Sequence, residues 1–221
     1  MKIGILIPCF NSSKFLNEAI ESALNQETKN QILIYTLDDG SIDDTSNKLH
    51  QLAKEHSIHI TLSVKNQGWC ASYNELANQA IEDNCESLMI MGSDDILNSL
   101  CIEKMSSALT DNDFVVCYGK QIGNGLDTMT SKDNAIVNDF KNENVICNFV
   151  LIKSNMWIEL NGYDTSFEHY SDWEFWIRAI KQGFKYCIVK EILYFYRLHE
   201  NQTHRKANDS LLKSKILSKY Y

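Results

Sequence analysis

Residues 32–41 read Ile32-Leu33-Ile34-Tyr35-Thr36-Leu37-Asp38-Asp39-Gly40-Ser41, an apolar run that ends in two carboxylates and a glycine. A short run that is apolar at both odd and even positions is typical of a strand buried on both faces of a parallel sheet. The arrangement returns at Leu88-Met89-Ile90-Met91-Gly92-Ser93-Asp94-Asp95. Because the carboxyl ends of parallel strands share one edge of a sheet, we expect both acidic pairs at the edge where open α/β sheets bind ligands.

Strand and helix patterns alternate on both sides of this stretch. Strand-like runs cover 2–8, 58–64, 87–91, 114–118, 149–152, 184–189 and 192–197. Helical spacing of apolar residues covers 15–24, the region around 49–53, and 69–83, 99–109, 153–160 and 172–182. This alternation predicts an α/β fold: a layered α/β/α arrangement with a mostly parallel central sheet and a Rossmann-like first half. Residues 120–144 keep no period and indicate a long loop. Residues 206–221 suit either a packed terminal helix or a weakly basic surface element, and the pattern favours the packed helix.

Length and composition fit one domain, 1–221, with a first half 1–119, a second half 120–204 and a tail 205–221. The formal charge of -8 argues against a nucleic-acid-binding surface, which needs a basic patch. No apolar run approaches the roughly 20 residues that span a bilayer, so we expect no transmembrane segment. The seven cysteines are odd in number and lack paired spacing, which favours a reducing, cytoplasmic location.

The acidic turn after the run at 32–37 has two interpretations. Aspartate, glycine and serine are what a tight strand-to-helix turn requires, and alone this structural reading is the better one. The functional reading is that one carboxylate, Asp39, accepts the imide N–H of a uracil ring. Asn66-Gln67-Gly68 indicates a second turn at this edge, where the glycine permits close approach of the backbone to a ligand.

Ser93-Asp94-Asp95 concentrates negative charge behind a buried strand. Adjacent carboxylates cost free energy unless a cation or a donor compensates them. Their hard oxygen atoms suit Mg²⁺ or Mn²⁺, which commonly bridge to substrate phosphates. The alternative is a cap for a helix that starts near Asn98, and the residues alone leave both readings open.

A third acidic cluster, Ser171-Asp172-Trp173-Glu174, opens the helical pattern at 172–182. Asp172 is a natural N-cap and Glu174 falls in the first turn, where the helix dipole favours acids. The functional reading makes Asp172 a general base at the mouth of a cleft. Trp173 either offers its face to a sugar ring or belongs to the core.

The last strand pattern ends in Arg197-Leu198-His199. A lone histidine is more often structural than a ligand. An arginine and a histidine together at a strand end also suit a diphosphate or a metal ion, so both readings stay open here.

Taken in order, these pieces resemble the inverting glycosyltransferases of family 2, which share the GT-A fold. The matching stretches cover nearly the whole chain and are Ile5-Leu6-Ile7-Pro8-Cys9-Phe10-Asn11, Asp38-Asp39-Gly40-Ser41-Ile42-Asp43-Asp44-Thr45, Lys65-Asn66-Gln67-Gly68, Met91-Gly92-Ser93-Asp94-Asp95, Asn161-Gly162-Tyr163-Asp164, Asp172-Trp173-Glu174-Phe175-Trp176-Ile177-Arg178 and Tyr196-Arg197-Leu198-His199. Gly92 and Ser171 stand where the family often has acids, and Tyr73 replaces a frequent arginine.

The resemblance implies a role for each part of the chain. Residues 1–119 would bind a nucleotide-sugar donor, most simply a UDP-sugar, and 120–204 a saccharide or glycolipid acceptor. Asp172 would deprotonate the acceptor hydroxyl for a single displacement that inverts the anomeric centre. The remaining assignments are Pro8, Asn11, Asp39, Asn66, Gly68 and Asp94 for the nucleotide, Asp95, Asp94 and His199 for Mn²⁺ or Mg²⁺, and Arg197, Trp173 and Glu174 for the diphosphate or acceptor side.

Three functions remain in view on this basis. The first is a metal-dependent glycosyltransferase of cell-surface polysaccharide or glycoconjugate synthesis, cytoplasmic and peripheral at the inner face of the membrane. The second is a sugar nucleotidyltransferase, which normally carries a Gly-rich basic loop after its first strand; Pro8-Cys9-Phe10-Asn11-Ser12-Ser13 lacks one. The third is a catalytically silent nucleotide-binding partner subunit that keeps the fold.

Overall fold

The computed structural model describes residues 1–200 and 210–221. Within them the strands are β1 (Lys2–Cys9), β2 (Gln31–Asp38), β3 (Ile58–Leu62), β4 (Ser87–Ile90), β5 (Ile96–Leu97), β6 (Phe114–Gly123), β7 (Thr128–Met129), β8 (Val150–Lys153) and β9 (Tyr186–Leu198). The helices are α1 (Leu16–Leu24), α2 (Thr45–Glu55), α3 (Trp69–Glu82), α4 (Cys101–Ala108), α5 (Ser154–Glu159), α6 (Ser171–Gln182) and α7 (Ser210–Tyr220), with 3-10 turns η1 (Val137–Lys141) and η2 (Thr165–Tyr170). No helix in these ranges is long and apolar enough to cross a membrane.

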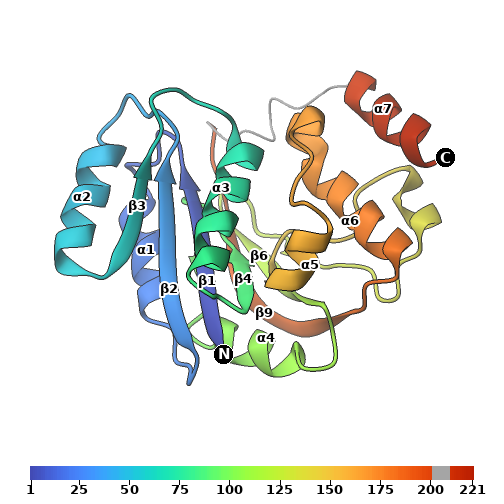
Figure 1. The fold of residues 1–221 in the computed structure, drawn as a ribbon, viewed down its shortest axis with the longest axis horizontal. Helices are drawn as coiled ribbons and strands as arrows, with labels where there is room; N and C mark the ends of the chain where they lie inside the picture. The colour runs from blue at the N-terminus through green and yellow to red at the C-terminus, as the bar shows by residue number, and fades with distance from the viewer. Residues whose placement is uncertain (201–209) are drawn as a thin grey trace.

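One sheet runs through the described residues in the order β3-β2-β1-β4-β8-β6-β9-β5, with β7 paired to β6 (Figure 1). The first four strands are parallel, and β1 lies between β2 and β4. The chain therefore leaves β1 toward β2 and β3 on one side and later returns to its other side with β4. Such a switch in strand order opens a crevice at the carboxyl ends of the two strands, which is where open α/β sheets bind ligands.

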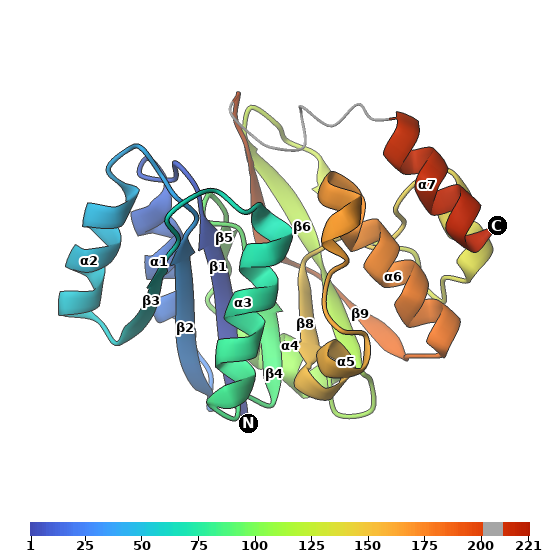
Figure 2. The same cartoon turned by 45° about the horizontal axis from the view of Figure 1, so that its top comes forward.

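Helices cover both faces of the sheet, as Figures 1 and 2 show. Apolar residues of α1, α2 and α4 form one core with one face of the sheet, and those of α3, α5, α6 and α7 form a second core with the other. In β1, Ile5 and Ile7 point to the first core whereas Leu6 points to the second. This two-sided burial explains why the strands read as continuous apolar runs, and it confirms the predicted α/β/α layers.

The second half of the sheet differs from the sequence prediction in two places. Residues 120–144 are not one long loop, because β6 continues to Gly123 and β7 folds back on it. The two strands predicted at 184–189 and 192–197 form one strand, β9 (Tyr186–Leu198). The strand has a bulge, since Val189 pairs with Cys117 but Ile192 pairs with the next residue, Tyr118. Strands β5, β7 and β8 pair antiparallel with their neighbours, so the sheet is parallel mainly in its first half.

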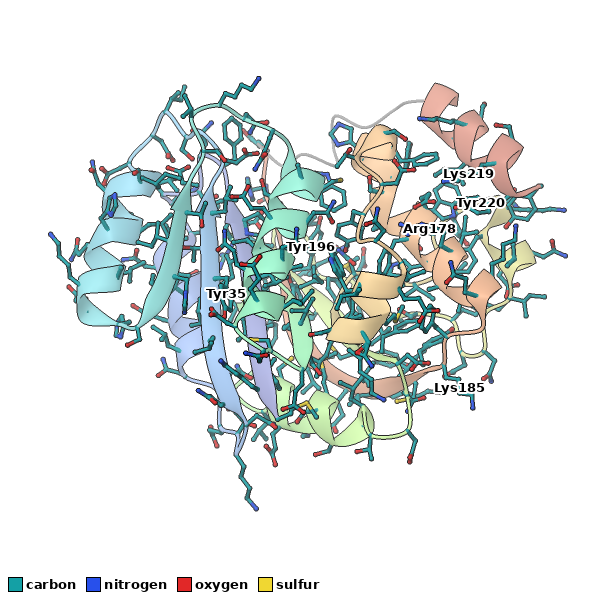
Figure 3. All side chains as sticks on the ribbon, viewed as in Figure 1. Tyr35, Arg178, Lys185, Tyr196, Lys219 and Tyr220 are labelled. Carbon is teal, nitrogen blue, oxygen red and sulfur yellow. The ribbon has the colours of Figure 1, made fainter. Side chains whose placement is uncertain are left out.

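The terminal helix α7 packs on α6, and the sequence pattern had predicted a packed terminal helix. Residues 205–209 of the predicted tail lie outside the described residues. Ile216 is fully buried in the second core. The carboxylate of Glu174, on α6, is also fully buried and accepts hydrogen bonds from Arg178 Nε at 2.8 and 2.9 Å, from Lys219 Nζ at 2.8 Å and from the Tyr220 hydroxyl. Figure 3 shows Arg178, Lys219 and Tyr220 converging between the two helices.

We expect the Glu174→Ala substitution to lower the free energy of unfolding by about 3 kcal/mol, because it removes a fully buried carboxylate and leaves the partly buried charge of Arg178 without its partner. Urea unfolding measures this change. The matched control is Glu159→Ala, at an exposed carboxylate of α5, which should change stability by less than about 0.5 kcal/mol. Equal stabilities of the two variants would contradict the structural role of Glu174.

Candidate active site

Three turns meet at the carboxyl edge of the parallel strands. The Ser12 hydroxyl, after β1, lies 2.7 Å from the Ser93 hydroxyl, after β4. The Asp39 amide, after β2, donates to the Cys9 carbonyl at 2.8 Å. The structure thus brings the first two acidic pairs to one edge, at the switch between β1 and β4.

Asp38 and Asp39 have different tasks in the turn after β2. Asp38 Oδ1 accepts the Ser41 amide at 3.1 Å, which is ordinary turn chemistry. Asp39 reaches across to the loop before α3 instead, where its two oxygens accept the amides of Gln67 at 2.8 Å and Gly68 at 2.9 Å. The Asn66 side chain closes this contact by donating to the Asp39 carbonyl at 3.2 Å. Each carboxylate oxygen of Asp39 can accept a second hydrogen bond, so these contacts leave room for a hydrogen bond from a bound ligand.

Pro8 and Asn11 flank the same edge. Pro8 lies in β1 beside Leu37 of β2. Asn11 has a φ of +51°, and its side-chain oxygen accepts the Ile42 amide at 2.9 Å. Between them, the Phe10 ring is 50% exposed, which the sequence reasoning did not single out. An exposed aromatic face at a ligand-binding edge can stack on a planar base.

The second acidic pair lies against the end of β9. Asp94 Oδ2 is 2.9 Å from His199 Nε2. Asp95 is buried, and its two oxygens accept the Arg197 amide at 2.9 Å and the Tyr194 hydroxyl at 2.7 Å. Burial and then the neighbouring Asp94 raise the pKa of Asp95 well above its usual range. The pair is followed by β5 and α4 begins only at Cys101, so neither acid caps a helix.

Arg197 is held under this turn. Its Nε donates to the Asp94 carbonyl at 2.8 Å, and its guanidinium lies 4.5 Å from the centre of the Phe15 ring and donates to Glu18 at 2.5 Å. Among the residues the structure describes, no group of three or more histidine, cysteine, aspartate or glutamate side chains converges as a ready metal cluster. Asp94 and His199 are the two such side chains that meet directly at this turn.

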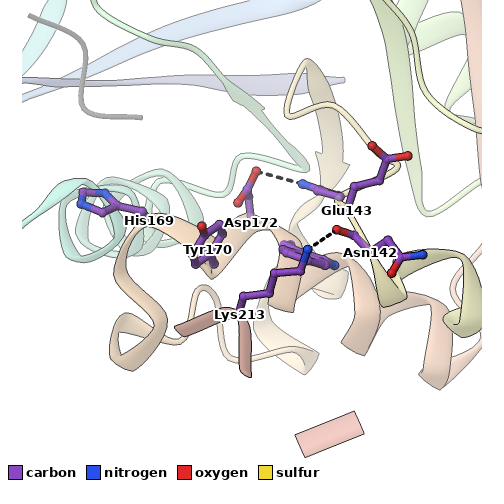
Figure 4. Close-up of a pocket in the computed structure, with 8 residues that line it drawn as sticks. Asn142, Glu143, His169, Tyr170, Asp172 and Lys213 are labelled. Atoms are coloured by element: carbon purple, nitrogen blue, oxygen red, sulfur yellow. Dashed lines mark hydrogen bonds between the residues drawn. The ribbon is translucent and has the colours of Figure 1, made fainter. Parts of the chain in front are cut away.

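Asp172 lines a separate pocket of about 380 Å³ (Figure 4). The pocket wall comes from distant segments and consists of Asn142, Glu143, Asn144, His169, Tyr170, Asp172, Trp173 and Lys213. Asp172 Oδ2 accepts the Asn144 side-chain amide at 3.0 Å, and Lys213 Nζ donates to the Asn142 carbonyl at 2.6 Å. Asn144 and Lys213 were not predicted, because only the folded chain brings them to α6.

Asp172 is not the N-cap of its helix. Helix α6 starts at Ser171, the capping position is Tyr170, and Asp172 is the second helical residue. Burial raises the pKa of Asp172 to about 6, against the opposing effect of hydrogen bonds from the Trp173 amide and Asn144. A carboxylate with a pKa near the working pH is suited to accept a proton in a reaction.

An aromatic group lies between the acidic pair and Asp172. The Tyr73 hydroxyl donates to the Met91 carbonyl, next to the acidic turn, at 2.9 Å. The ring centres of Tyr73 and Tyr163 are 6.0 Å apart, and Trp69 contacts both. Burial and then Asp172 raise the pKa of Tyr163, and burial, then Tyr163 and then Asp95 and Asp94 raise the pKa of Tyr73. The rings thus bring the surroundings of the two acidic sites into contact.

Two further predictions at α6 change with the structure. The assignment of Glu174 to the diphosphate or acceptor side is wrong, because its carboxylate is buried among Arg178, Lys219 and Tyr220 and does not line the Asp172 pocket. Trp173 is largely a core residue, 3% exposed, whose Nε1 donates to the Phe140 carbonyl at 3.1 Å.

The layered α/β fold with acidic turns at one edge of its sheet defines the chain as a ligand-binding α/β domain. The sequence matches the model of glycosyl transferase family 2 over residues 4–158, and the chain belongs to that family. It is 27% identical to chondroitin synthase of Escherichia coli over 94% of this chain and 30% of that protein. It is 25% identical to the minor teichoic acid biosynthesis protein GgaA of Bacillus subtilis, over 95% of this chain and 48% of that protein. The chain thus spans less than half the length of these two relatives.

Solved structures share the fold at low sequence identity. The structure of S. aureus TarS in complex with UDP matches with a TM-score of 0.77 and 16% identity, over 100% of this chain and 70% of that one. The mannosyltransferase PcManGT of Pyrobaculum calidifontis, in complex with GDP-Man and Mn²⁺, matches with a TM-score of 0.68 and 14% identity, over 92% of this chain and 59% of that one.

Proposed function

We propose that the chain transfers one sugar from a UDP-sugar to an acceptor hydroxyl with inversion at the anomeric carbon. The observation that carries this proposal is the position of Asp172, whose pKa is raised to about 6, in a pocket separate from the nucleotide edge. Two distinct sites suit a reaction that joins a donor to an acceptor. The relatives that act in chondroitin and teichoic acid synthesis support a place in polysaccharide or glycoconjugate synthesis.

The nucleotide would lie across the turns after β1, β2 and β3. Asp39, buried and already braced by the Gln67 and Gly68 amides, has lone pairs to accept the imide N–H of uracil. The half-exposed Phe10 ring would offer a stacking face next to Asn11. A neighbour of the same fold whose structure contains UDP supports UDP as the nucleotide.

The residues present fit a divalent cation through Asp94 and His199. Their side chains meet at 2.9 Å and combine a hard oxygen donor with an imidazole, whereas the carboxylate of Asp95 is buried and faces the Tyr194 hydroxyl and the Arg197 amide of β9. We therefore propose Asp94 with His199 as the ligands for Mn²⁺ or Mg²⁺, and Asp95 as their support. When bound, the cation would offset the charge that develops on the leaving diphosphate.

In the proposed reaction Asp172 takes the proton of the acceptor hydroxyl. The freed oxygen attacks the anomeric carbon from the face opposite the nucleotide, and the bond to the diphosphate oxygen breaks with its electron pair leaving on UDP. One displacement inverts the configuration, and no covalent enzyme intermediate forms. Asn144 orients the Asp172 carboxylate by its hydrogen bond. The acceptor, a saccharide or glycolipid, would enter through the pocket of Figure 4.

We expect UDP to bind in calorimetry, and to bind more tightly with Mn²⁺ than without it, because a cation held by Asp94 and His199 would offset the charge of the diphosphate. GDP titrated under the same conditions should bind more weakly, because guanine has no uracil imide N–H to donate to Asp39. Failure of UDP to bind under both conditions would contradict the proposal. UDP binding without hydrolysis or transfer of any UDP-sugar tested would favour the silent partner subunit.

A further inference from the structure

We infer that Tyr194 is a positioning residue that acts through Asp95 to hold Asp94 and His199 together. The inference concerns geometry at the proposed metal site and so rests on the proposed function for its consequence. Tyr194 lies in β9, is 2% exposed, and carries no part of the motifs that the sequence singled out.

The hydroxyl of Tyr194 connects both ends of the acidic turn. It accepts the Gly92 amide at 3.0 Å and donates to Asp95 Oδ2 at 2.7 Å. The ring of Tyr194 stacks on Phe149, with 4.3 Å between the ring centres, and this contact holds it in place. A buried hydroxyl that both donates and accepts in this way fixes the spacing between the backbone at residue 92 and the carboxylate at residue 95.

Glycine at position 92 is what makes this closure possible. A Cβ atom built there would lie 2.6 Å from Asp95 Oδ2 and 2.9 Å from Asp94 Oδ1. Any side chain would therefore push the two carboxylates out of their present positions. The departure from the family at Gly92 and the contact of Tyr194 with Asp95 thus belong to one arrangement.

Residues further along β9 also contact Asp95 and the two proposed ligands. Three residues after Tyr194, the Arg197 amide donates to Asp95 Oδ1 at 2.9 Å and its Nε donates to the Asp94 carbonyl at 2.8 Å. Two residues later, His199 meets Asp94 at 2.9 Å. Asp95 is thereby held from both oxygens by β9, and the distance between Asp94 and His199 follows from how tightly the turn is bound to that strand.

The test is Tyr194→Phe, with Tyr186→Phe as the matched control. Tyr186 lies on the same strand, its ring stacks on Phe114 at 4.8 Å, and its hydroxyl also accepts a backbone amide, from Ala135 at 3.0 Å, and donates to a carbonyl, of Lys132. Both variants keep the ring and lose one comparably bonded hydroxyl, and only Tyr194 touches the acidic turn.

Two readouts are measured on the full chain. The first is the imidazole nitrogen chemical shift of His199 in histidine-labelled protein without metal or nucleotide, which should move in Tyr194→Phe and stay at the wild-type value in Tyr186→Phe. The second is Mn²⁺ affinity at saturating UDP, followed by the electron paramagnetic resonance of free Mn²⁺. It should fall about tenfold in Tyr194→Phe only, the lower end of the effect expected for loss of a residue that orients a metal ligand.

The readouts separate the inference from the proposed function. An unmoved His199 shift in Tyr194→Phe overturns the positioning role whatever the metal does. Equal Mn²⁺ affinities in the two variants, with wild-type protein binding Mn²⁺, also overturn it. A moved His199 shift in a protein whose wild-type form binds no Mn²⁺ supports the positioning of His199 by Tyr194 and contradicts the metal site of the proposed function.

Discussion

Asp172→Asn is expected to lower kcat by about 10²–10⁴-fold, the contribution typical of a positioned general base. Asparagine keeps the size of the side chain and a hydrogen bond to Asn144, but it cannot accept the acceptor's proton. UDP affinity should stay at the wild-type value, because Asp172 lines a pocket apart from the nucleotide edge. A UDP-release assay gives kcat, and calorimetry gives the affinity for UDP.

The control is Asp133→Asn, which removes an exposed carboxylate paired with Lys190 and should leave turnover unchanged. Near-normal turnover in Asp172→Asn would move the base elsewhere. The pH profile supplies an independent check. Because Asp172 must be ionised and its pKa is raised to about 6, kcat/KM should fall tenfold per pH unit below about pH 6 and level off above it. A profile that is flat between pH 5 and pH 7 on this scale would contradict the assignment.

Asp94→Asn is expected to weaken UDP binding in the presence of Mn²⁺ by about a hundredfold, because loss of a direct ligand should cost at least as much as loss of a residue that orients one. UDP binding without Mn²⁺ should change little. Asp95→Asn should have the smaller effect, about tenfold, because its side chain can keep part of the bracket with Tyr194 and Arg197. Calorimetric titrations of UDP with and without Mn²⁺ measure both variants.

The order of the two variants decides between two assignments. The sequence resemblance assigns both Asp95 and Asp94 to the metal without choosing a main ligand, whereas the contacts in the structure favour Asp94 with His199. A larger loss in Asp95→Asn than in Asp94→Asn would make Asp95 the main ligand. Equal and small losses in both would place the cation elsewhere on the donor edge.

The first half of the fold could be predicted because its information is local. Strands such as β1 and β2 are buried on both faces, and their apolar runs and the turns behind them lie within ten residues of one another. Asp39 and the acidic pair at 94–95 follow from the same rule, since a strand's end is visible in the sequence. The role of Asp39 in bracing Gln67 was not visible, because it depends on two loops 28 residues apart.

The rest depends on contacts between distant segments. Asn144 reaches Asp172 across 28 residues and Tyr194 reaches Asp95 across 99, with no periodic signal that joins them. Glu174 failed as a site residue for a related reason. A first-turn acid on a helix has the same sequence pattern whether it faces a pocket or a neighbouring helix, and α7 decides the matter. Residues 120–123 escaped prediction because they form a strand by pairing with β9 and, at Lys120, with β7.

The bulge in β9 also determines which face of the sheet the Tyr194 side chain points to. Side chains alternate along a strand, so two residues five positions apart, such as Val189 and Tyr194, should point to opposite faces. Their partners on β6, Cys117 and Gly119, are only two positions apart and share a face. Between these two pairs β9 has three more residues than β6. Each residue of β9 after the bulge therefore points to the opposite face of the sheet from the one that simple alternation predicts. Deleting one residue from the bulge would turn Tyr194 away from the acidic turn, although every sequence motif of the family would remain unchanged.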